Sequence, residues 1–121
     1  MSENPNRRTT EEVLSHHLYF CQKACLEETL EDYDEDSVIV NMGGAVKGLS
    51  AIKTFFKDSM ETCLPGDSVY KTIYQHISGE IALCVWSAES SFYSVPFGTD
   101  TFIIRNGKIM QQTFSGILNK K

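Results

Sequence analysis

A chain of 121 residues, 41% of them hydrophobic and 22% charged, supports one folded domain with a buried core but is too short for two. The formal net charge of −5 argues against nucleic acid or an anionic membrane as the main partner, because both require a basic surface. No apolar run is long enough to span a membrane, and the first residues lack an apolar signal segment. Four cysteines without a C-x-x-C pair are typical of a reduced, cytoplasmic protein.

The first half of the chain begins with a polar tail and a capped helix. Residues 1–8 are expected to be disordered, ahead of a single domain over residues 9–118. Thr9 is a candidate N-cap, and Glu12 three residues later completes a capping box. One face of the helix is then marked at helical spacing by Val13, Leu14, His17, Leu18, Cys21, Ala24 and Cys25.

Two further helices and a short hairpin follow. Residues 27–33 predict a short helix, and the acidic run LEETLEDYDED around it is interpreted as a solvated helix face. The β-branched residues 38–40 predict a strand, and GGAVKG predicts a turn with a short returning strand. Residues 49–64 form a clear amphipathic pattern, with Ser50 as the candidate cap.

The second half predicts strands only. Four runs bounded by turn residues are rich in β-branched and aromatic side chains: 69–77, 81–88, 92–105 and 108–116. Asn106-Gly107 between the last two runs is the dipeptide that best fits a tight type I′ turn. Pro96 predicts a bulge or an edge position in the third run. Helices followed by strands indicate an α+β fold, in which three N-terminal helices cover one face of an antiparallel sheet.

This layout resembles the nuclear-transport-factor-2-like superfamily and, within it, the SnoaL-like proteins. The resemblance covers residues 9–116 and depends on three stretches in order: LEETLEDYDEDSVIV, VKGLSAIKTFF and DTFIIRNGKIMQQTF. It implies a cone, in which a curved antiparallel sheet wraps around the helices and leaves a pocket inside. Members include ketosteroid isomerase, scytalone dehydratase, limonene epoxide hydrolase and polyketide cyclases. Others are binding or dimerisation modules, so the resemblance implies a pocket and not a reaction.

The ketosteroid isomerases imply positions for the residues of that pocket. They carry a Tyr on the first helix, a general-base Asp at the end of the first strand, and a protonated Asp on the strand before the last turn. Counted from the shared Tyr33, these positions are occupied by His17, Asn41 and Asp100. The residues expected to contact a ligand are Tyr33, Asn41, Phe55, Trp86, Gln112 and Phe114.

Asp100 interrupts an otherwise apolar strand, where aspartate is disfavoured. If its side chain points into the cone, burial raises its pKa and makes it a candidate acid or hydrogen-bond donor. An ion pair with His17 would instead lower that pKa. Asn41 cannot accept a proton, so the isomerase base is missing and His17 becomes the candidate base, oriented by Asp100. The alternative is that both side chains form hydrogen bonds and only line a binding cavity.

Two other patterns bear on partners. His17 and Cys21 lie one helical turn apart, but no further ligand pair is visible, so buried thiols are expected rather than a metal site or a Cys–His nucleophile. Many aromatic residues fall on the sheet: Tyr70, Tyr74, Trp86, Phe92, Tyr93 and Phe97. Since the helices cover one face only, we expect the outer face to form a homodimer interface; the alternative is that some of these rings are exposed singly.

The sequence therefore predicts a cone that binds a small apolar or aromatic molecule. The hypothesis of catalysis is a lyase, isomerase or hydrolase that acts through His17 and Asp100. The rival is a non-catalytic binding or dimerisation module whose pocket is filled by Phe55, Trp86 and Phe114. No cofactor, nucleic acid or membrane is expected as a partner.

Overall fold

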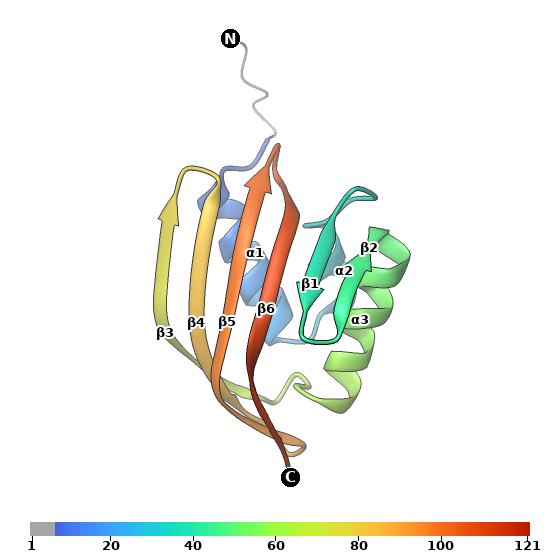
Figure 1. The fold of residues 1–121 in the computed structure, drawn as a ribbon, viewed down its shortest axis with the longest axis vertical. Helices are drawn as coiled ribbons and strands as arrows, with labels where there is room; N and C mark the ends of the chain where they lie inside the picture. Colours follow the sequence, from blue (N-terminus) through green and yellow to red (C-terminus); the bar gives the residue numbers. More distant parts are fainter. Residues whose placement is uncertain (1–6) are drawn as a thin grey trace.

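The computed structural model describes residues 7–121, in which helices pack against one face of a six-stranded sheet (Figure 1). The helices are α1 (Thr10–Gln22), α2 (Leu26–Leu30) and α3 (Gly48–Thr62). The strands are β1 (Val38–Asn41), β2 (Gly44–Lys47), β3 (Val69–Ser78), β4 (Ile81–Glu89), β5 (Tyr93–Arg105) and β6 (Lys108–Lys120). In this part of the chain, no helix is long and apolar enough to cross a membrane.

The helices begin where local hydrogen bonding allows. The predicted capping box is confirmed, because the Thr9 hydroxyl accepts from the Glu12 amide at 3.1 Å and the Glu12 carboxylate accepts from the Thr9 amide at 2.8 Å. The prediction that Ser50 caps the third helix is wrong. The helix starts at Gly48, so the N-cap is Lys47 and Ser50 lies inside α3. Gly48 has a φ of +85°, which few residues other than glycine adopt.

The sheet confirms the predicted α+β class and adds one parallel pairing. Strands β3 to β6 form the expected antiparallel meander, and the strand order is β2-β1-β6-β5-β4-β3. Asn106 and Gly107 both have positive φ, as a type I′ turn requires. The bulge expected at Pro96 is confirmed by register shifts on both sides of β5. Strand β1 pairs with β6 in parallel, so the sheet is mixed.

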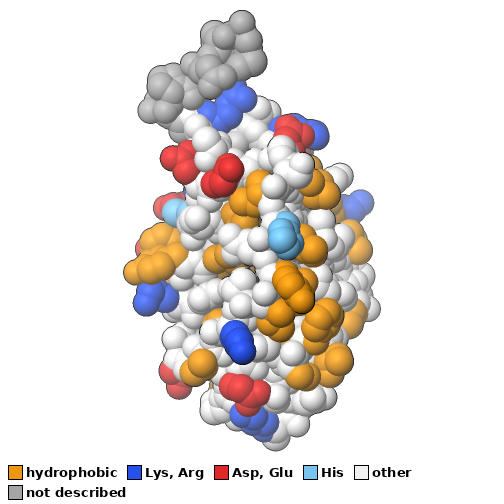
Figure 2. Space-filling model, turned by 90° about the vertical axis from the view of Figure 1, so that its left-hand side faces the viewer, with side chains coloured by type: hydrophobic (Ala, Val, Ile, Leu, Met, Phe, Trp, Pro, Cys, Tyr) orange, Lys and Arg blue, Asp and Glu red, His pale blue; other side chains and the backbone are white. Residues whose placement is uncertain are grey.

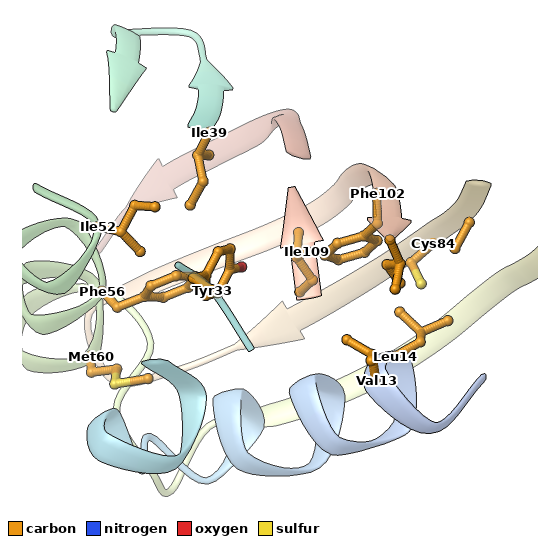
Figure 3. Close-up of a cluster of buried hydrophobic side chains, with 12 residues drawn as sticks. Val13, Leu14, Tyr33, Ile39, Ile52, Phe56, Met60, Cys84, Phe102 and Ile109 are labelled. Carbon is orange, nitrogen blue, oxygen red and sulfur yellow. The ribbon is translucent and has the colours of Figure 1, made fainter. Parts of the chain in front are cut away.

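The core fills the space between the helices and the face of the sheet that they cover, here called the inner face (Figure 3). Helix α1 lies behind the meander, and α3 lies beside the β1–β2 hairpin (Figure 1). Side chains that are at most 2% exposed come from all of these elements: Val13, Leu14, Tyr33, Ile39, Ile52, Phe102, Ile104 and Ile109. Burial of this many large apolar groups is the main source of stability.

The predicted disordered tail falls mostly outside the described residues. Residues 1–6 are not described. Arg7 and Arg8 are, and both make side-chain hydrogen bonds: Arg7 donates to Asn106 Oδ1 at 2.9 Å, and Arg8 donates to the Gly107 carbonyl at 2.8 Å. The chain ahead of α1 is therefore fastened to the β5–β6 turn.

Candidate functional site

The register of the sheet brings Asp100 to the middle of the inner face. Its Cα partners are Cys84 on β4 and Phe114 on β6, and paired residues of an antiparallel ladder share a face. Two positions along, the buried Phe102 pairs with Gln112 on that same face. Asp100 therefore points toward the helices, among residues that belong to the core.

Four side chains form one hydrogen-bonded chain, which we call the Asp100 network: Tyr33, Gln112, Asp100 and Trp86. The Tyr33 hydroxyl donates to Gln112 Oε1, and Gln112 Nε2 donates to Asp100 Oδ1 at 3.1 Å. From the other side, Trp86 Nε1 donates to Asp100 Oδ2 at 2.7 Å. Each carboxyl oxygen of Asp100 therefore accepts from one neutral N–H donor, and Gln112 links Asp100 to Tyr33.

Burial dominates the proton affinities in the network. It raises the pKa of Asp100, against the opposing effects of the Gln112 and Trp86 hydrogen bonds and of the nearby His17. It also raises the pKa of the Tyr33 hydroxyl well above its ordinary value, which keeps Tyr33 a donor. Burial, helped by the charges of Asp100 and Asp32, raises the pKa of the Cys21 thiol to about 12. Cys21 is therefore protonated at neutral pH and unsuited to act as a nucleophile.

The members of the network differ in how completely they are buried. Tyr33 and Gln112 are 2% and 5% exposed, whereas Asp100 and Trp86 are only half-buried. Aromatic rings continue from that point, because Phe114 stacks on Trp86 at a centroid distance of 6.0 Å and an interplanar angle of 21°. A polar chain that holds a carboxyl group beside stacked rings has the makeup of a small-molecule site.

Gly98 places the indole of Trp86. It is the Cα partner of Trp86, and a Cβ atom built on it would lie 2.7 Å from two atoms of the indole. The ring thus lies across the backbone of β5 and reaches Asp100 two residues further along that strand. Gly98 was not among the residues predicted for the site, although a glycine inside a strand signals close approach by another group.

His17 lies beside a different carboxylate. His17 Nδ1 is 3.7 Å from Asp32 Oδ2, and no hydrogen bond between His17 and Asp100 is present in residues 7–121. Asp32 is completely buried and is also approached by His16 Nδ1 at 2.8 Å and by Arg8 Nη1 at 2.8 Å. The sequence analysis placed Asp32 in a solvated acidic run. The structure buries it because its carbonyl accepts from the Ile109 amide of β6 at 2.7 Å.

The cluster of Asp32, Arg8, His16 and His17 surrounds a buried carboxylate. Burial raises the pKa of Asp32, but the nearby His17, His16 and Arg8 lower it by more, so its net pKa lies below the ordinary value. Asp32 is therefore ionised at neutral pH. In residues 7–121, no group of three or more His, Cys, Asp or Glu side chains is placed to hold a metal ion.

The other candidate residues occupy different places. Phe55 is half-buried on α3 and contacts Phe56, with ring centroids 5.3 Å apart. Asn41 ends β1 at a hairpin turn, where its Oδ1 accepts from the Gly43 amide at 2.7 Å. Five of the eight candidates therefore meet through hydrogen bonds or ring stacking: Tyr33, Trp86, Asp100, Gln112 and Phe114.

A hollow of about 380 Å³ lies away from the Asp100 network, near the β5–β6 turn. Its lining residues are Asp34, Asp36, Val38, Ile103, Arg105, Asn106, Lys108, Met110 and Gln111. Ile103 and Gln111 are Cα partners on the face opposite to Phe102 and Gln112, so the hollow opens on the outer face. The interior pocket implied by the resemblance stays a prediction.

Comparison with known proteins identifies the fold. No protein-family model and no curated protein matches the sequence. An NTF2-like protein of unknown function from Mesorhizobium loti superposes with a TM-score of 0.76 at 17% identity, over 97% of this chain and 99% of that one. The chain has the NTF2-like fold.

Two other solved structures with this fold have been given functions. A proposed ketosteroid isomerase from Kribbella flavida superposes with a TM-score of 0.74 at 14% identity, over 92% of this chain and 81% of that one. A proposed polyketide cyclase from Sinorhizobium meliloti gives 0.73 at 17% identity, over 84% and 92%. The resemblance seen in the sequence is thereby confirmed for the fold. Identities this low show nothing about the reaction.

Proposed function

We propose that the inner face binds a small apolar or aromatic molecule at the Asp100 network. The observation that carries the proposal is the half-buried Asp100 carboxyl, held by Gln112 and Trp86 and flanked by the ring of Phe114. Burying a carboxyl group costs free energy, and an apolar side chain would pack there at a lower cost. A carboxyl with a perturbed pKa in such a place is a typical feature of a functional site.

Catalysis without a cofactor is the finer form of this proposal. Asp100 would act as the acid, since a raised pKa suits a proton donor near neutral pH. His17 would act as the base, and the nearby Asp32, at 3.7 Å, takes the orienting role that the sequence assigned to Asp100. The reaction class is a lyase, an isomerase or a hydrolase. Asn41 again argues against ketosteroid isomerisation, because an amide accepts no proton.

A screen by thermal denaturation tests ligand binding. Steroids, terpenoids, aromatic polyketide-like acids and small phenolics are each added to the wild type, to Asp100→Ala and to Asp67→Ala, an exposed control. A ligand that binds only the folded protein raises the melting temperature. We expect hits that Asp100→Ala loses and Asp67→Ala keeps. A cooperative melt without a shift in any class would contradict the proposal.

Turnover separates catalysis from binding alone. With a ligand in hand, Asp100→Asn should abolish conversion while it leaves the circular dichroism spectrum unchanged. Conversion at an unchanged rate in Asp100→Asn would rule out the acid role, and a change of affinity without any conversion in the wild type would favour a binding module.

We also propose that the outer face joins two copies of the chain in a reducing compartment such as the cytoplasm. Apolar side chains there are between 38% and 60% exposed: Tyr74, Ile81, Leu83, Phe97 and Ile117. Figure 2 shows hydrophobic side chains gathered around a histidine on the side of the molecule where β3 lies. Contiguous exposed apolar area of this kind favours an interface. The free thiols of Cys21, Cys25, Cys63 and Cys84 are typical of reducing conditions.

A further inference from the structure

We propose that the ligand of the Asp100 network is an amine, with a protonated nitrogen that contacts Asp100 and an apolar or aromatic body that contacts the neighbouring rings. This inference rests on the binding form of the proposed function, not on the acid role of Asp100, and narrows its ligand to one chemical class. Three features of the network support it: its lack of an ion-pair partner, the direction of its hydrogen bonds and the rings beside it.

The first feature is that Asp100 forms no ion pair within the described residues, although His17 lies near enough to lower its pKa. Asp100 accepts from an indole and a carboxamide, which are both neutral, and no ion pair of residues 7–121 includes it. Asp32 differs from Asp100 in this respect, because its Oδ1 forms an ion pair with Arg8 Nη1 at 2.8 Å. Buried carboxylates are usually paired with a cation. Asp100 forms no ion pair within the described chain, and the residue is not completely buried.

The second feature is the direction of the hydrogen bonds. Both oxygens of Asp100 receive an N–H donor, an arrangement that favours the ionised form, because the hydroxyl oxygen of a protonated acid is a poorer acceptor. Gln112 accepts from the Tyr33 hydroxyl with its Oε1 and directs its Nε2 at Asp100. The network is therefore built around a carboxylate, which offers its remaining lone pairs to a donor on the ligand. A ligand carbonyl is an acceptor, so it would require a hydrogen-bond donor where the carboxylate offers only lone pairs.

The third feature is the set of rings beside the carboxyl. Phe114 stacks on Trp86, and the centroid of the Tyr70 ring lies 5.8 Å from that of Trp86. The faces of aromatic rings attract cations, and Trp is the strongest of them. An ammonium group at this place gains from the carboxylate, and the aromatic body of the ligand gains from packing against the rings. A neutral group has no such electrostatic attraction to Asp100, and an anion is repelled by it.

Three molecules of nearly the same shape test the assignment: tryptamine is a cation at pH 7, tryptophol is neutral, and indole-3-acetate is an anion. Their dissociation constants for the full chain are measured by calorimetry. We expect tryptamine to bind at least about tenfold more tightly than tryptophol, as one charge-assisted hydrogen bond implies, and indole-3-acetate to bind more weakly than both. In Asp100→Asn the ratio of tryptamine to tryptophol should fall to near one, whereas in Asp67→Asn it should stay as in the wild type.

Each other outcome overturns the inference in a distinct way. Tryptophol or indole-3-acetate binding as tightly as tryptamine, with binding lost in Asp100→Ala, would keep the site and reject the amine. A tenfold preference that persists in Asp100→Asn would place the amine elsewhere. If none of the three molecules binds while a neutral compound from the thermal-denaturation screen does, that result rejects the amine and keeps the ligand site. If no compound in that screen binds either, the proposed function is rejected as well. The comparison among ligands uses the wild type, so a poorly folded variant does not weaken it.

Discussion

Single residues decide the geometry of the Asp100 network, and Gly98 is the clearest case. Its missing side chain lets the Trp86 indole lie across β5, with Nε1 at 2.7 Å from Asp100. A methyl group on Gly98 would overlap two ring atoms at 2.7 Å, so the indole would have to move. Position 98 therefore controls the contact between the aromatic surface and the carboxyl group.

Replacing Gly98 with alanine should displace the indole and break its hydrogen bond to Asp100. Overpacking of this kind typically costs about 1–3 kcal/mol of the free energy of unfolding. Trp86 is the single tryptophan, so its fluorescence emission reports the displacement directly. Gly43→Ala is a matched control, because its Cβ would meet only the end of the Asn41 side chain, at 3.2 Å. Unchanged emission and stability in Gly98→Ala would contradict this account.

At the scale of elements, Asp32 joins segments that are distant in the sequence. It follows α2, contacts His16 of α1, and pairs with Arg8, which also donates to Gly107 in the β5–β6 turn. Helix α1 and the last hairpin are therefore held by one ionised carboxylate. Since its pKa is lowered in the folded state, this contribution is complete above the ordinary pKa of about 3.9 and is lost as the pH falls through the lowered value.

Urea unfolding at a series of pH values tests that contribution. The wild type should lose stability on acidification below about pH 4, and Asp32→Asn should lose less over the same range. At pH 7 the variant should be less stable by about 1.5–3 kcal/mol, the usual cost of losing a hydrogen bond to a charged group. Glu80→Gln, which removes an exposed pair with Arg105, is the control and should melt as the wild type does. Parallel acid profiles for the wild type and Asp32→Asn would refute this account.

Asp100 changes the stability with pH in the opposite direction to Asp32 and over a different pH range. Its pKa is raised in the folded state, so stability falls as the pH rises from the ordinary pKa through the raised one. The effects of Asp32 and Asp100 are thus separated on the pH axis, the former below and the latter above the ordinary aspartate pKa.

The elements were largely predictable because their signals are local. Turn residues such as Asn106-Gly107 mark where strands end, and the Thr9 capping box marks where α1 begins. The contacts that build the site depend on distant residues and have no such signal. Nothing near Asp32 in the sequence shows that β6 will bury it, and the parallel pairing of β1 with β6 joins residues more than 70 positions apart.

The residues of the candidate site also differ in whether a local pattern predicts them. Asp100 stands out in the sequence because it interrupts an apolar strand, and the resemblance placed Tyr33 and Gln112 beside it. His17 was matched to Asp100 because both positions line the pocket of the related isomerases. The structure brings His17 to Asp32 instead, since α1 carries it toward the end of α2. The packing of the helices decides which carboxylate a helical side chain contacts. Local sequence patterns do not predict that packing.

For the whole molecule, the outer face predicts the oligomeric state. We expect a dimer in size-exclusion chromatography with light scattering. Leu83→Lys should give a folded monomer, because Leu83 lies in the exposed apolar area of β4 and a buried, unpaired ammonium is costly. Met42→Lys, at an exposed apolar residue of the β1–β2 turn, should remain dimeric. A monomeric wild type, or a dimer that Leu83→Lys leaves intact, would exclude this interface.

The strand order also has a consequence for how the chain is made. The β1–β2 hairpin is synthesised early, yet the neighbour of β1 in the sheet is β6, the last strand along the chain. While the ribosome is still translating the middle of the message, β1 has one unpaired edge and no partner for it. An isolated two-stranded hairpin is only marginally stable in water, so the early segment must wait, open to chaperones or to mispairing, until residues 108–120 emerge.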